Sequence, residues 1–337
     1  MSDNDFWLGA YLYYGEPREL FLAEAVRPFV ERILTERLAD QFFFIRFSEQ
    51  GPHIRLRFKG SQQTLVRAVK PGLDAFFSRY MEACPSSREE LTGMEMLPAE
   101  QQWRPNNTIH YVPYEPEIER YGGPTGVDIA ERQFQHSSRM VLRLLTSSKN
   151  WDYDRALGAA IQMHLGLAWA LGMSLTETRY FYARISEAWL VRAYDFSPHH
   201  SAEKNEARRE MTLAAFAETF ERQQEVLVAY HGQFWQLLTG GESFEQEWLN
   251  DWLCGMKELG RELMAADTCN RLIYPNGFNP DPTIPIPIKR QHLWSIVGSY
   301  VHMTNNRLGI HNRDEAYLGY LTVKSLEKLE KIWGEKV

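Results

Sequence analysis

The chain has 337 residues, of which 44% are hydrophobic and 13% aromatic, so it can bury a large core and is not a disordered chain. The formal net charge of −7 and the lack of a long basic run exclude a nucleic-acid interface of the basic-stripe kind. Cys84, Cys254 and Cys269 lie far apart and form no C-x-x-C pair, which favours a reducing compartment. Without a secretory signal or an apolar run of membrane length, the sequence predicts a cytoplasmic protein.

The first 125 or so residues carry the signals of an antiparallel sheet with flanking helices. A strand is expected from Trp7 to Tyr14, where Gly15-Glu16-Pro17 ends it, and helical spacing follows from Leu20 to Leu38. A second helix is expected from Leu65 to Tyr80, and a further strand begins at Thr108 and ends at Tyr114.

The rest of the chain is predicted to be mostly helical. Helical spacing recurs around residues 140–145, 157–169, 180–189, 213–238, 248–264, 293–308 and 318–329. The stretch from Asn276 to Ile288 contains four prolines, which exclude a helix and predict an extended loop. The expected class is α+β, with the sheet portion (1–125) packed on the helical portion (126–337) within one domain over residues 1–337.

A basic row on a predicted hairpin is the first candidate site. Phe42 to Phe47 and His53 to Phe58 predict two strands joined by a Gly-Pro turn. In the second strand His53, Arg55 and Arg57 point to one face, while the apolar residues between them point to the other. A buried basic row is costly unless an anion meets it, so either a solvated face or an anion site explains the pattern.

Two further polar groups lie outside the hairpin. Glu117 and Arg120 stand three residues apart, before Gly122-Gly123, and predict either a surface ion pair or a ligand-binding turn. In the predicted helix around residue 302, His302 is followed one turn later by Asn305 and Asn306. Asparagine fills helix interiors poorly, so this cluster predicts either an oriented, reactive imidazole or a buried structural histidine.

Together these blocks resemble a known family. Phe-Phe-Phe-Ile-Arg-Phe, Gly-Pro-His-Ile-Arg-Leu-Arg-Phe, Tyr-Glu-Pro-Glu-Ile-Glu-Arg-Tyr-Gly-Gly and His-Met-Thr-Asn-Asn-Arg-Leu are similar to the C-terminal elimination domain of class I lanthipeptide dehydratases, the nisin-type enzymes. The resemblance extends from Trp7 to about Leu321. The same family includes standalone proteins of thiopeptide clusters, and the lack of a large glutamylation domain makes this chain similar to those members.

The resemblance implies a lyase that expels glutamate from glutamylated serine or threonine of a precursor peptide, leaving dehydroalanine or dehydrobutyrine. It implies a separate tRNA-dependent glutamylating protein as partner and a peptide with a leader and a glutamylated core. It implies no cofactor, no direct nucleic-acid or membrane contact, and leaves a homodimer open. A lost acid in the segment Phe134-Gln135-His136-Ser137-Ser138, where the family often has Asp-Ser, leaves the substrate details open.

Matching motif to motif, the resemblance carries roles to residues of this chain. His302 would move the proton, while Arg57 and Arg120 hold carboxylates and Glu117 orients Arg120 or shares the proton transfer. Arg55 would support the two arginines, and Asn305 or Asn306 would orient His302. The remaining substrate contacts are expected from Arg46, His53 and Tyr121.

Two other functions remain open at the sequence level. A pyridine synthase of the same family joins two dehydroalanines and expels the leader peptide, a reaction that needs no seat for free glutamate. A non-catalytic protein could instead bind a precursor peptide by adding a strand to a sheet edge. A metal site is not expected, because His199 and His200 have no cysteine or third histidine at ligand spacing.

Overall fold

The computed structural model of the chain describes residues 5–89, 96, 98, 101–147, 151–193, 201–241 and 243–334. The chain divides into two compact units. The sheet unit comprises residues 1–117 and 130–151, and the helical unit comprises residues 118–129 and 152–337. The two units therefore interleave along the sequence, because a short segment of the helical unit interrupts the sheet unit.

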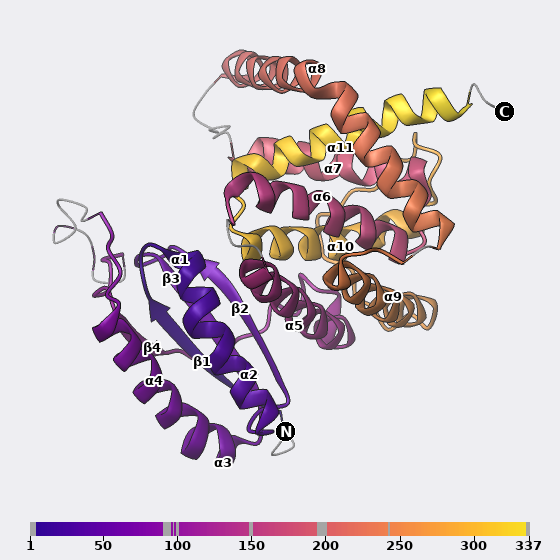
Figure 1. The fold of residues 1–337 in the computed structure, drawn as a ribbon. Coiled ribbons are helices and arrows are strands. Elements are labelled where there is room, and N and C mark those ends of the chain that lie inside the picture. The colour runs from indigo at the N-terminus through magenta and orange to yellow at the C-terminus, as the bar shows by residue number, and fades with distance from the viewer. Residues whose placement is uncertain are drawn as a thin grey trace. The chain divides into compact units, whose positions relative to one another are not determined.

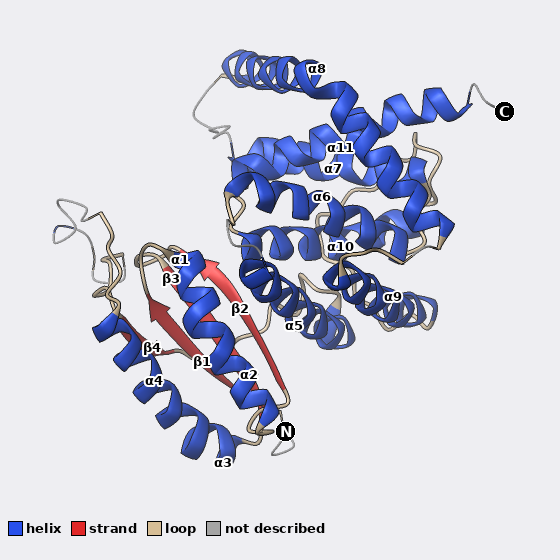
Figure 2. Cartoon of the chain, in the orientation of Figure 1, coloured by secondary structure: helices blue, strands red, loops and turns tan. Residues whose placement is uncertain are grey.

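The sheet unit contains a sheet whose four strands, among the described residues, are ordered β2-β3-β1-β4 and pair antiparallel. Figure 2 draws them in red. They are β1 (Phe6–Tyr13), β2 (Gln41–Phe47), β3 (His53–Gly60) and β4 (Thr108–Tyr111). In the predicted hairpin Phe42 lies opposite Phe58 and Phe44 lies opposite Leu56, so these side chains share one face.

That face is covered by two helical segments (Figure 1). The first runs through α1 (Arg18–Phe21), a π-helical turn (Leu22–Val26) and α2 (Arg27–Thr35), and the second through α3 (Gln62–Thr64), a π-helical turn (Leu65–Val69) and α4 (Lys70–Ala83). The ring of Phe29 lies 6.0 Å from that of Phe58 in the sheet and 5.1 Å from that of Phe77 in α4. Aromatic rings thus join both segments to the sheet, and the rings of Phe29, Phe58 and Phe77 are fully buried.

Helices make up the helical unit. They are α6 (Tyr153–Ala170), α7 (Leu175–Ala193), α8 (Ala202–Gly240), α9 (Glu247–Thr268), α10 (Ile288–Leu308) and α11 (Asn312–Gly334). Helix α11 packs on α7 and α8, α6 packs on α9, and α10 contacts α6 and α7. Helix α5 (Gly123–Ser147) belongs to both units, since its first residues fall in the helical unit and those from Ala130 onward in the sheet unit.

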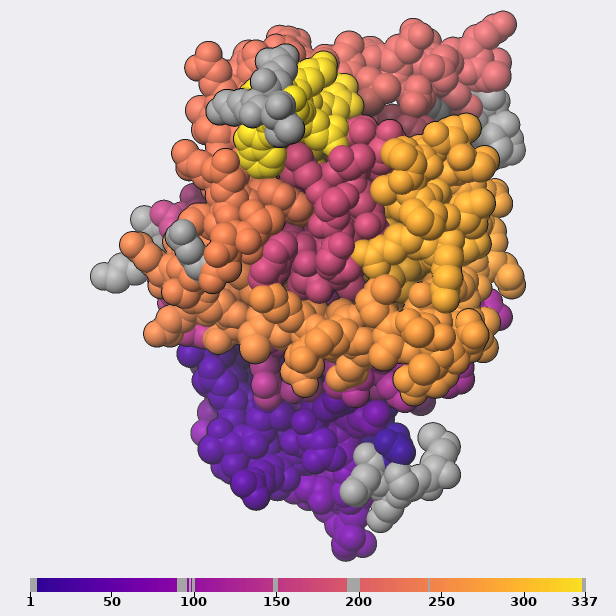
Figure 3. All heavy atoms as spheres, turned by 90° about the vertical axis from the view of Figure 1, so that its right-hand side faces the viewer, coloured from indigo at the N-terminus to yellow at the C-terminus, as the bar shows by residue number. Residues whose placement is uncertain are grey.

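The predicted fold class is confirmed: an antiparallel sheet with flanking helices comes first and a helical part follows. The proline-rich stretch before α10 contains neither helix nor strand from 271 to 287. Figure 3 shows this part of the chain at the surface, in the colours between the orange of α9 and the yellow of α11. Asp152 caps α6 through its Oδ1, which accepts a hydrogen bond from the Arg155 backbone N–H (2.9 Å).

Candidate functional site

Strand β3 presents two arginines on the sheet face opposite the helical segments. Arg55 places its guanidinium carbon 3.5 Å from the ring centroid of Phe47 and 4.6 Å from that of Tyr11. Arg57 lies 4.5 Å from the ring centroid of Tyr114. An aromatic face attracts a guanidinium without neutralising its charge, so both side chains are oriented and remain cationic.

His53 shares this face of β3 but is completely buried. Its Nδ1 donates to the Gly51 carbonyl (2.8 Å) and its Nε2 accepts from Arg55 Nε (3.1 Å). Burial lowers the pKa of His53 to about 4, so the ring is neutral near pH 7. With both nitrogens bonded inside the protein, His53 orients Arg55, and any substrate contact would require this cluster to open.

Arg46 lies on the opposite face of the sheet from Arg55 and Arg57. It pairs with Ile54 in the register, and the side chain of Ile54 faces the helices. Only 7% of the Arg46 side chain is exposed, and its Nη1 forms an ion pair with Glu19 of α1. Arg46 thus lies in an ion pair of the core, because the alternation of strand β2 directs the side chain inward, and its contact with substrate stays a prediction.

Glu117, the last residue of the first sheet-unit segment, is exposed. Burial lowers the pKa of the Arg57 guanidinium, and the nearby Tyr114, Tyr11 and Glu117 partly offset that shift. The carboxylate of Glu117 thus belongs to the surroundings of Arg57 within the sheet unit. The sequence predicted that it would accompany Arg120 instead, and that role stays a prediction.

The turn after residue 117 places Arg120 in the helical unit. Gly122 and Gly123 have φ of +92° and +83°, conformations that favour glycine, and a Cβ on Gly122 would lie 2.5 Å from Ile296 Cδ1 of α10. The glycines therefore let the turn pack closely on α10. Arg120 Nε donates to Ser299 Oγ of the same helix (3.2 Å), and its guanidinium lies over the buried ring of Tyr121.

A cavity of about 890 Å³ opens in the helical unit, and both Arg120 and His302 line it. Further lining residues include the aromatic side chains Phe181, Trp189, Phe278 and Trp294 and the charged side chains Arg184, Glu187 and Arg192. Glu187 is paired with Arg209 (2.9 Å), so the arginines leave the cavity with an excess of positive charge. An anionic ligand with an apolar portion fits such a lining.

His302 is held by a carboxylate that the sequence analysis did not single out. Its Nδ1 lies 2.7 Å from Glu315 Oε1 of α11. The Glu315 side chain is 0% exposed, whereas 19% of the His302 side chain is exposed. The imidazole also packs on Trp189, with ring centroids 4.6 Å apart. One ring nitrogen thus faces a buried acid, and Nε2 is the nitrogen left for the cavity.

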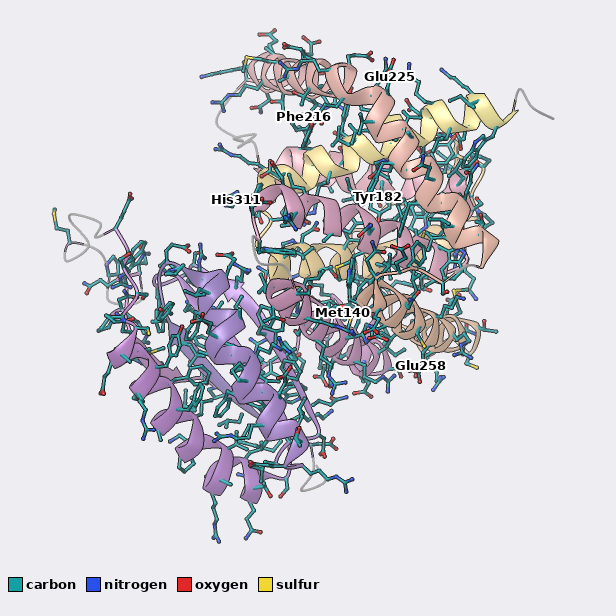
Figure 4. The ribbon with its side chains drawn as sticks, viewed as in Figure 1. Met140, Tyr182, Phe216, Glu225, Glu258 and His311 are labelled. Atoms are coloured by element: carbon teal, nitrogen blue, oxygen red, sulfur yellow. The ribbon has the colours of Figure 1, made fainter. Side chains whose placement is uncertain are left out.

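The same carboxylate receives a second hydrogen bond from Asn305, whose Nδ2 donates to Glu315 Oε2 (3.1 Å). Asn305 Oδ1 in turn lies 2.8 Å from His164 Nε2 of α6. Burial lowers the pKa of His164 to about 4, and its ring stacks on Tyr182, which Figure 4 labels inside the helical unit. Asn305 therefore acts on His302 through Glu315, while Asn306, half-buried on α10, stays a predicted contact.

The start of α11 places Glu315. The His311 backbone N–H donates to Tyr153 Oη (3.0 Å), and Tyr153 Oη donates to Asp314 Oδ2. This anchor fixes the turn that Figure 4 labels at His311 and leaves Glu315 in the first helical turn, where the helix dipole favours a carboxylate. The sequence contained one signal for Glu315: it is an acid in the first turn of α11, the helix that follows α10 with His302. The contact between Glu315 and His302, however, depends on how the two helices pack.

The structure brings His302, Arg120 and Tyr121 together in the helical unit and gathers Arg55, Arg57, His53 and Glu117 in the sheet unit. In the ranges the structure describes, no three His, Cys, Asp or Glu side chains group as metal ligands would. His199 and His200 lie outside those ranges. No described helix combines the length and apolarity needed to cross a membrane.

Residues 7–326 match the protein family described as "Lantibiotic biosynthesis dehydratase C-term". Among curated proteins, the nisin biosynthesis protein NisB of Lactococcus lactis subsp. lactis is 27% identical over 148 residues. The subtilin biosynthesis protein SpaB of Bacillus subtilis is 29% identical over 147 residues. These matches cover 44% and 43% of this chain but only 12% of either relative's length.

Solved structures show the same fold at low sequence identity. The pyridine synthase TbtD from thiomuracin biosynthesis superposes with a TM-score of 0.72 at 18% identity, covering 97% of this chain and all of TbtD. TsrL gives 0.68 at 16% identity, with 96% and 95% covered. The tRNA-dependent lantibiotic dehydratase MibB from Microbispora sp. 107891 gives 0.58 at 22% identity, covering 98% of this chain and 29% of MibB.

Proposed function

We propose that this chain, which belongs to the family of the C-terminal part of lantibiotic biosynthesis dehydratases, is a lyase that eliminates glutamate from glutamylated serine or threonine. The product would be dehydroalanine or dehydrobutyrine in a ribosomally made peptide. One observation carries the proposal: a carboxylate-held histidine and an arginine line the same cavity. Such an elimination requires a base that removes the Cα proton and a cationic group that binds the departing carboxylate.

His302 supplies the base. Its Nε2 takes the proton from Cα of the esterified residue, and the electron pair left behind forms the Cα–Cβ double bond. The Cβ–O bond breaks, and its electron pair leaves with the glutamate carboxylate. The imidazolium that forms is stabilised by the buried Glu315 carboxylate 2.7 Å away.

Arg120 supplies the cationic seat in the helical unit. A guanidinium forms two parallel hydrogen bonds with a carboxylate, and Ser299 and Tyr121 keep this one oriented. The leaving carboxylate gains negative charge as the Cβ–O bond breaks, so an oriented cation favours that step. Arg55 and Arg57, on the sheet unit, are proposed to bind carboxylates of the glutamylated peptide.

The proposal includes a partner and a location. A separate tRNA-dependent glutamylating protein would make the ester, and the precursor peptide would arrive with its leader and a glutamylated core. Both reactions would take place in the cytoplasm, since glutamyl-tRNA is made there. The net charge of −7 disfavours direct binding of the tRNA by this chain.

The direct test uses a synthetic peptide that carries a glutamyl-serine ester. Incubation with the full chain should release free glutamate and leave dehydroalanine, with the peptide losing the mass of one glutamic acid. His302→Ala should lower the release about 1,000-fold, whereas Glu258→Ala, a change at an exposed position of α9 in the same unit, should preserve it.

A peptide with a leader and two dehydroalanines tests the rival activity. If the chain converts that peptide to a pyridine and expels the leader while leaving the ester untouched, the protein is a cyclase and the elimination proposal fails. If the chain only binds both peptides, with no chemistry on either, it is a recruiter and both enzymatic readings fail.

A further inference from the structure

We propose that Glu315 is a positioning residue that fixes the tautomer of His302 with the proton on Nδ1, and that Asn305 and His164 hold Glu315 in place. The consequence for catalysis rests on the proposed function. The tautomer itself does not, because it follows from hydrogen bonds inside the helical unit. Tautomer and activity can therefore be tested separately.

Glu315 is a buried acid with unusual partners. Its side chain is fully buried, and within the described ranges no Lys or Arg nitrogen lies within 4.0 Å of its oxygens. An ionised carboxylate in such a place needs hydrogen-bond donors. His302 Nδ1 meets one oxygen at 2.7 Å and Asn305 Nδ2 meets the other at 3.1 Å. The first turn of α11 adds the favourable end of a helix dipole.

The direction of the hydrogen-bond chain follows from its far end. His164 is neutral near pH 7, because burial keeps its pKa at about 4, and it carries one ring proton. Its Nε2 donates to Asn305 Oδ1 (2.8 Å), which turns the amide NH₂ toward Glu315. Glu315 Oε2 is thus occupied as an acceptor, and in the proposed arrangement Oε1 accepts from His302 Nδ1.

This arrangement determines which nitrogen of His302 reacts. With the proton on Nδ1 bonded to Glu315, the lone pair is on Nε2, the nitrogen left for the cavity. Trp189 packs on the ring and limits its rotation. The opposite tautomer would place a proton on Nε2 and remove the base. A protonated Glu315 that donated to Nδ1 would produce that inactive tautomer, so the two protonation states of Glu315 give opposite results.

The decisive measurement is long-range ¹H–¹⁵N NMR on the ¹⁵N-labelled full chain at neutral pH, with the His302 signals assigned by their loss in His302→Ala. The expected result is a protonated Nδ1 and an unprotonated Nε2 in the wild type. In Glu315→Gln the amide can donate to Nδ1, so the signals should move to the Nε2–H form. A wild type already in the Nε2–H form, or a Glu315→Gln spectrum identical to the wild type, overturns the proposal.

Activity gives the second readout. Glu315→Gln should lower kcat for glutamate release about 100-fold with little change in KM, because the substrate does not touch residue 315. Glu315→Asp should recover part of the loss. Glu327→Gln, a change on the more exposed side of the same helix, is the matched control and should leave both the His302 tautomer and kcat as in the wild type.

Asn305→Ser tests the same hydrogen-bond network if Glu315→Gln does not fold. Asn305→Ser removes the amide clamp while Glu315 stays, so the Nδ1–H tautomer should persist with a roughly 5-fold lower kcat and a shifted acidic limb of the pH profile. If Glu315→Gln does not fold, an unchanged pH profile and an unchanged kcat in Asn305→Ser overturn the proposal that Asn305 holds Glu315 in place. If the wild type releases no glutamate, the proposed function fails, and the NMR result still decides the tautomer.

Discussion

The two units hold their arginines in different ways. In the sheet unit Arg55 and Arg57 rest on the rings of Phe47, Tyr11 and Tyr114 along a strand, with a histidine that is buried and neutral beside them. In the helical unit Arg120 lines a cavity together with a histidine that is partly exposed and bonded to an acid. The sheet unit presents oriented arginines, whereas the helical unit presents an arginine and the histidine that we propose as the base.

His53 and His302 differ in burial and in the hydrogen bonds of their ring nitrogens. Both nitrogens of His53 are hydrogen-bonded, one to a carbonyl and one to an arginine, so this ring orients its neighbours. In His302 one nitrogen is bonded to Glu315, and the other is left for the cavity. The His53 ring is thus fully hydrogen-bonded within the protein, whereas the His302 ring has one nitrogen for the proton transfer that we propose.

The largest expected effect is at His302. His302→Ala should lower kcat for glutamate release by about 1,000-fold, within the usual range for loss of a general base. His53→Ala changes the matching histidine of the sheet unit. It should lower the activity per folded molecule far less. Circular dichroism measures the folded fraction, and the glutamate assay measures the activity. Equal losses of activity per folded molecule would contradict the division between the units.

Acid should destabilise both units through their buried histidines. The pKa values of His53 and His164 are lowered to about 4 by burial, so between pH 6.5 and 4 the unfolded chain binds protons that the folded chain does not. Stability should therefore fall as the pH drops through that window and stay flat above it. Each histidine contributes up to about 3 kcal/mol.

Chemical denaturation at several pH values measures this dependence. His164→Asn should reduce the slope for the helical unit, where the buried His231, whose pKa is also lowered to about 4, retains part of the dependence. His53→Asn should flatten the slope for the sheet unit. Intrinsic tryptophan fluorescence and far-ultraviolet dichroism are followed together. A slope that neither variant changes would assign acid sensitivity to other groups.

Arg57→Ala should raise KM for the glutamyl peptide about 10-fold and leave kcat within a factor of a few, because a bound carboxylate loses one charged hydrogen-bond partner. Arg57→Lys keeps the charge and loses the planar contact with Tyr114, so its KM should lie between those of the wild type and Arg57→Ala. A melting temperature that falls while KM stays unchanged would make Arg57 a purely structural residue of the sheet.

The smallest effect is expected on the cavity wall. Arg184→Ala combined with Arg192→Ala should raise KM about 3-fold for peptides with acidic residues near the ester, and the effect should fade with added salt because both side chains are exposed. Arg261→Ala, an exposed position on α9, serves as control. No difference between acidic and neutral peptides would remove these arginines from substrate recognition.

Much of the fold could be predicted from periodicity. The alternation in β3 correctly separated Arg55 and Arg57 from the buried Ile54, Leu56 and Phe58, because strand geometry has a period of two. The same rule applied to β2 places Arg46 on the inner face. Its ion pair with Glu19 could not be predicted from the sequence, because Glu19 lies on a separate helix.

The candidate site was harder to predict than the fold. His302 could be selected from its local polar cluster and from motifs, but Glu315 and His164 could not, since they come from α11 and α6 and meet at α10 only after the helices pack. Local spacing suggested Asn305 as the partner of the imidazole. Packing inserted a carboxylate between them, a contact that no helical period encodes.

The interleaved path of the chain has a consequence for dissecting the protein. Arg120 reaches the helical unit on a segment of only residues 118–129, while the chain on both sides of it belongs to the sheet unit. A fragment starting at residue 152 would keep His302 and Glu315 but lose the arginine of the cavity. Because the units interleave, no single cut of the polypeptide separates one whole unit from the other, and a two-fragment experiment would have to divide the chain at three places.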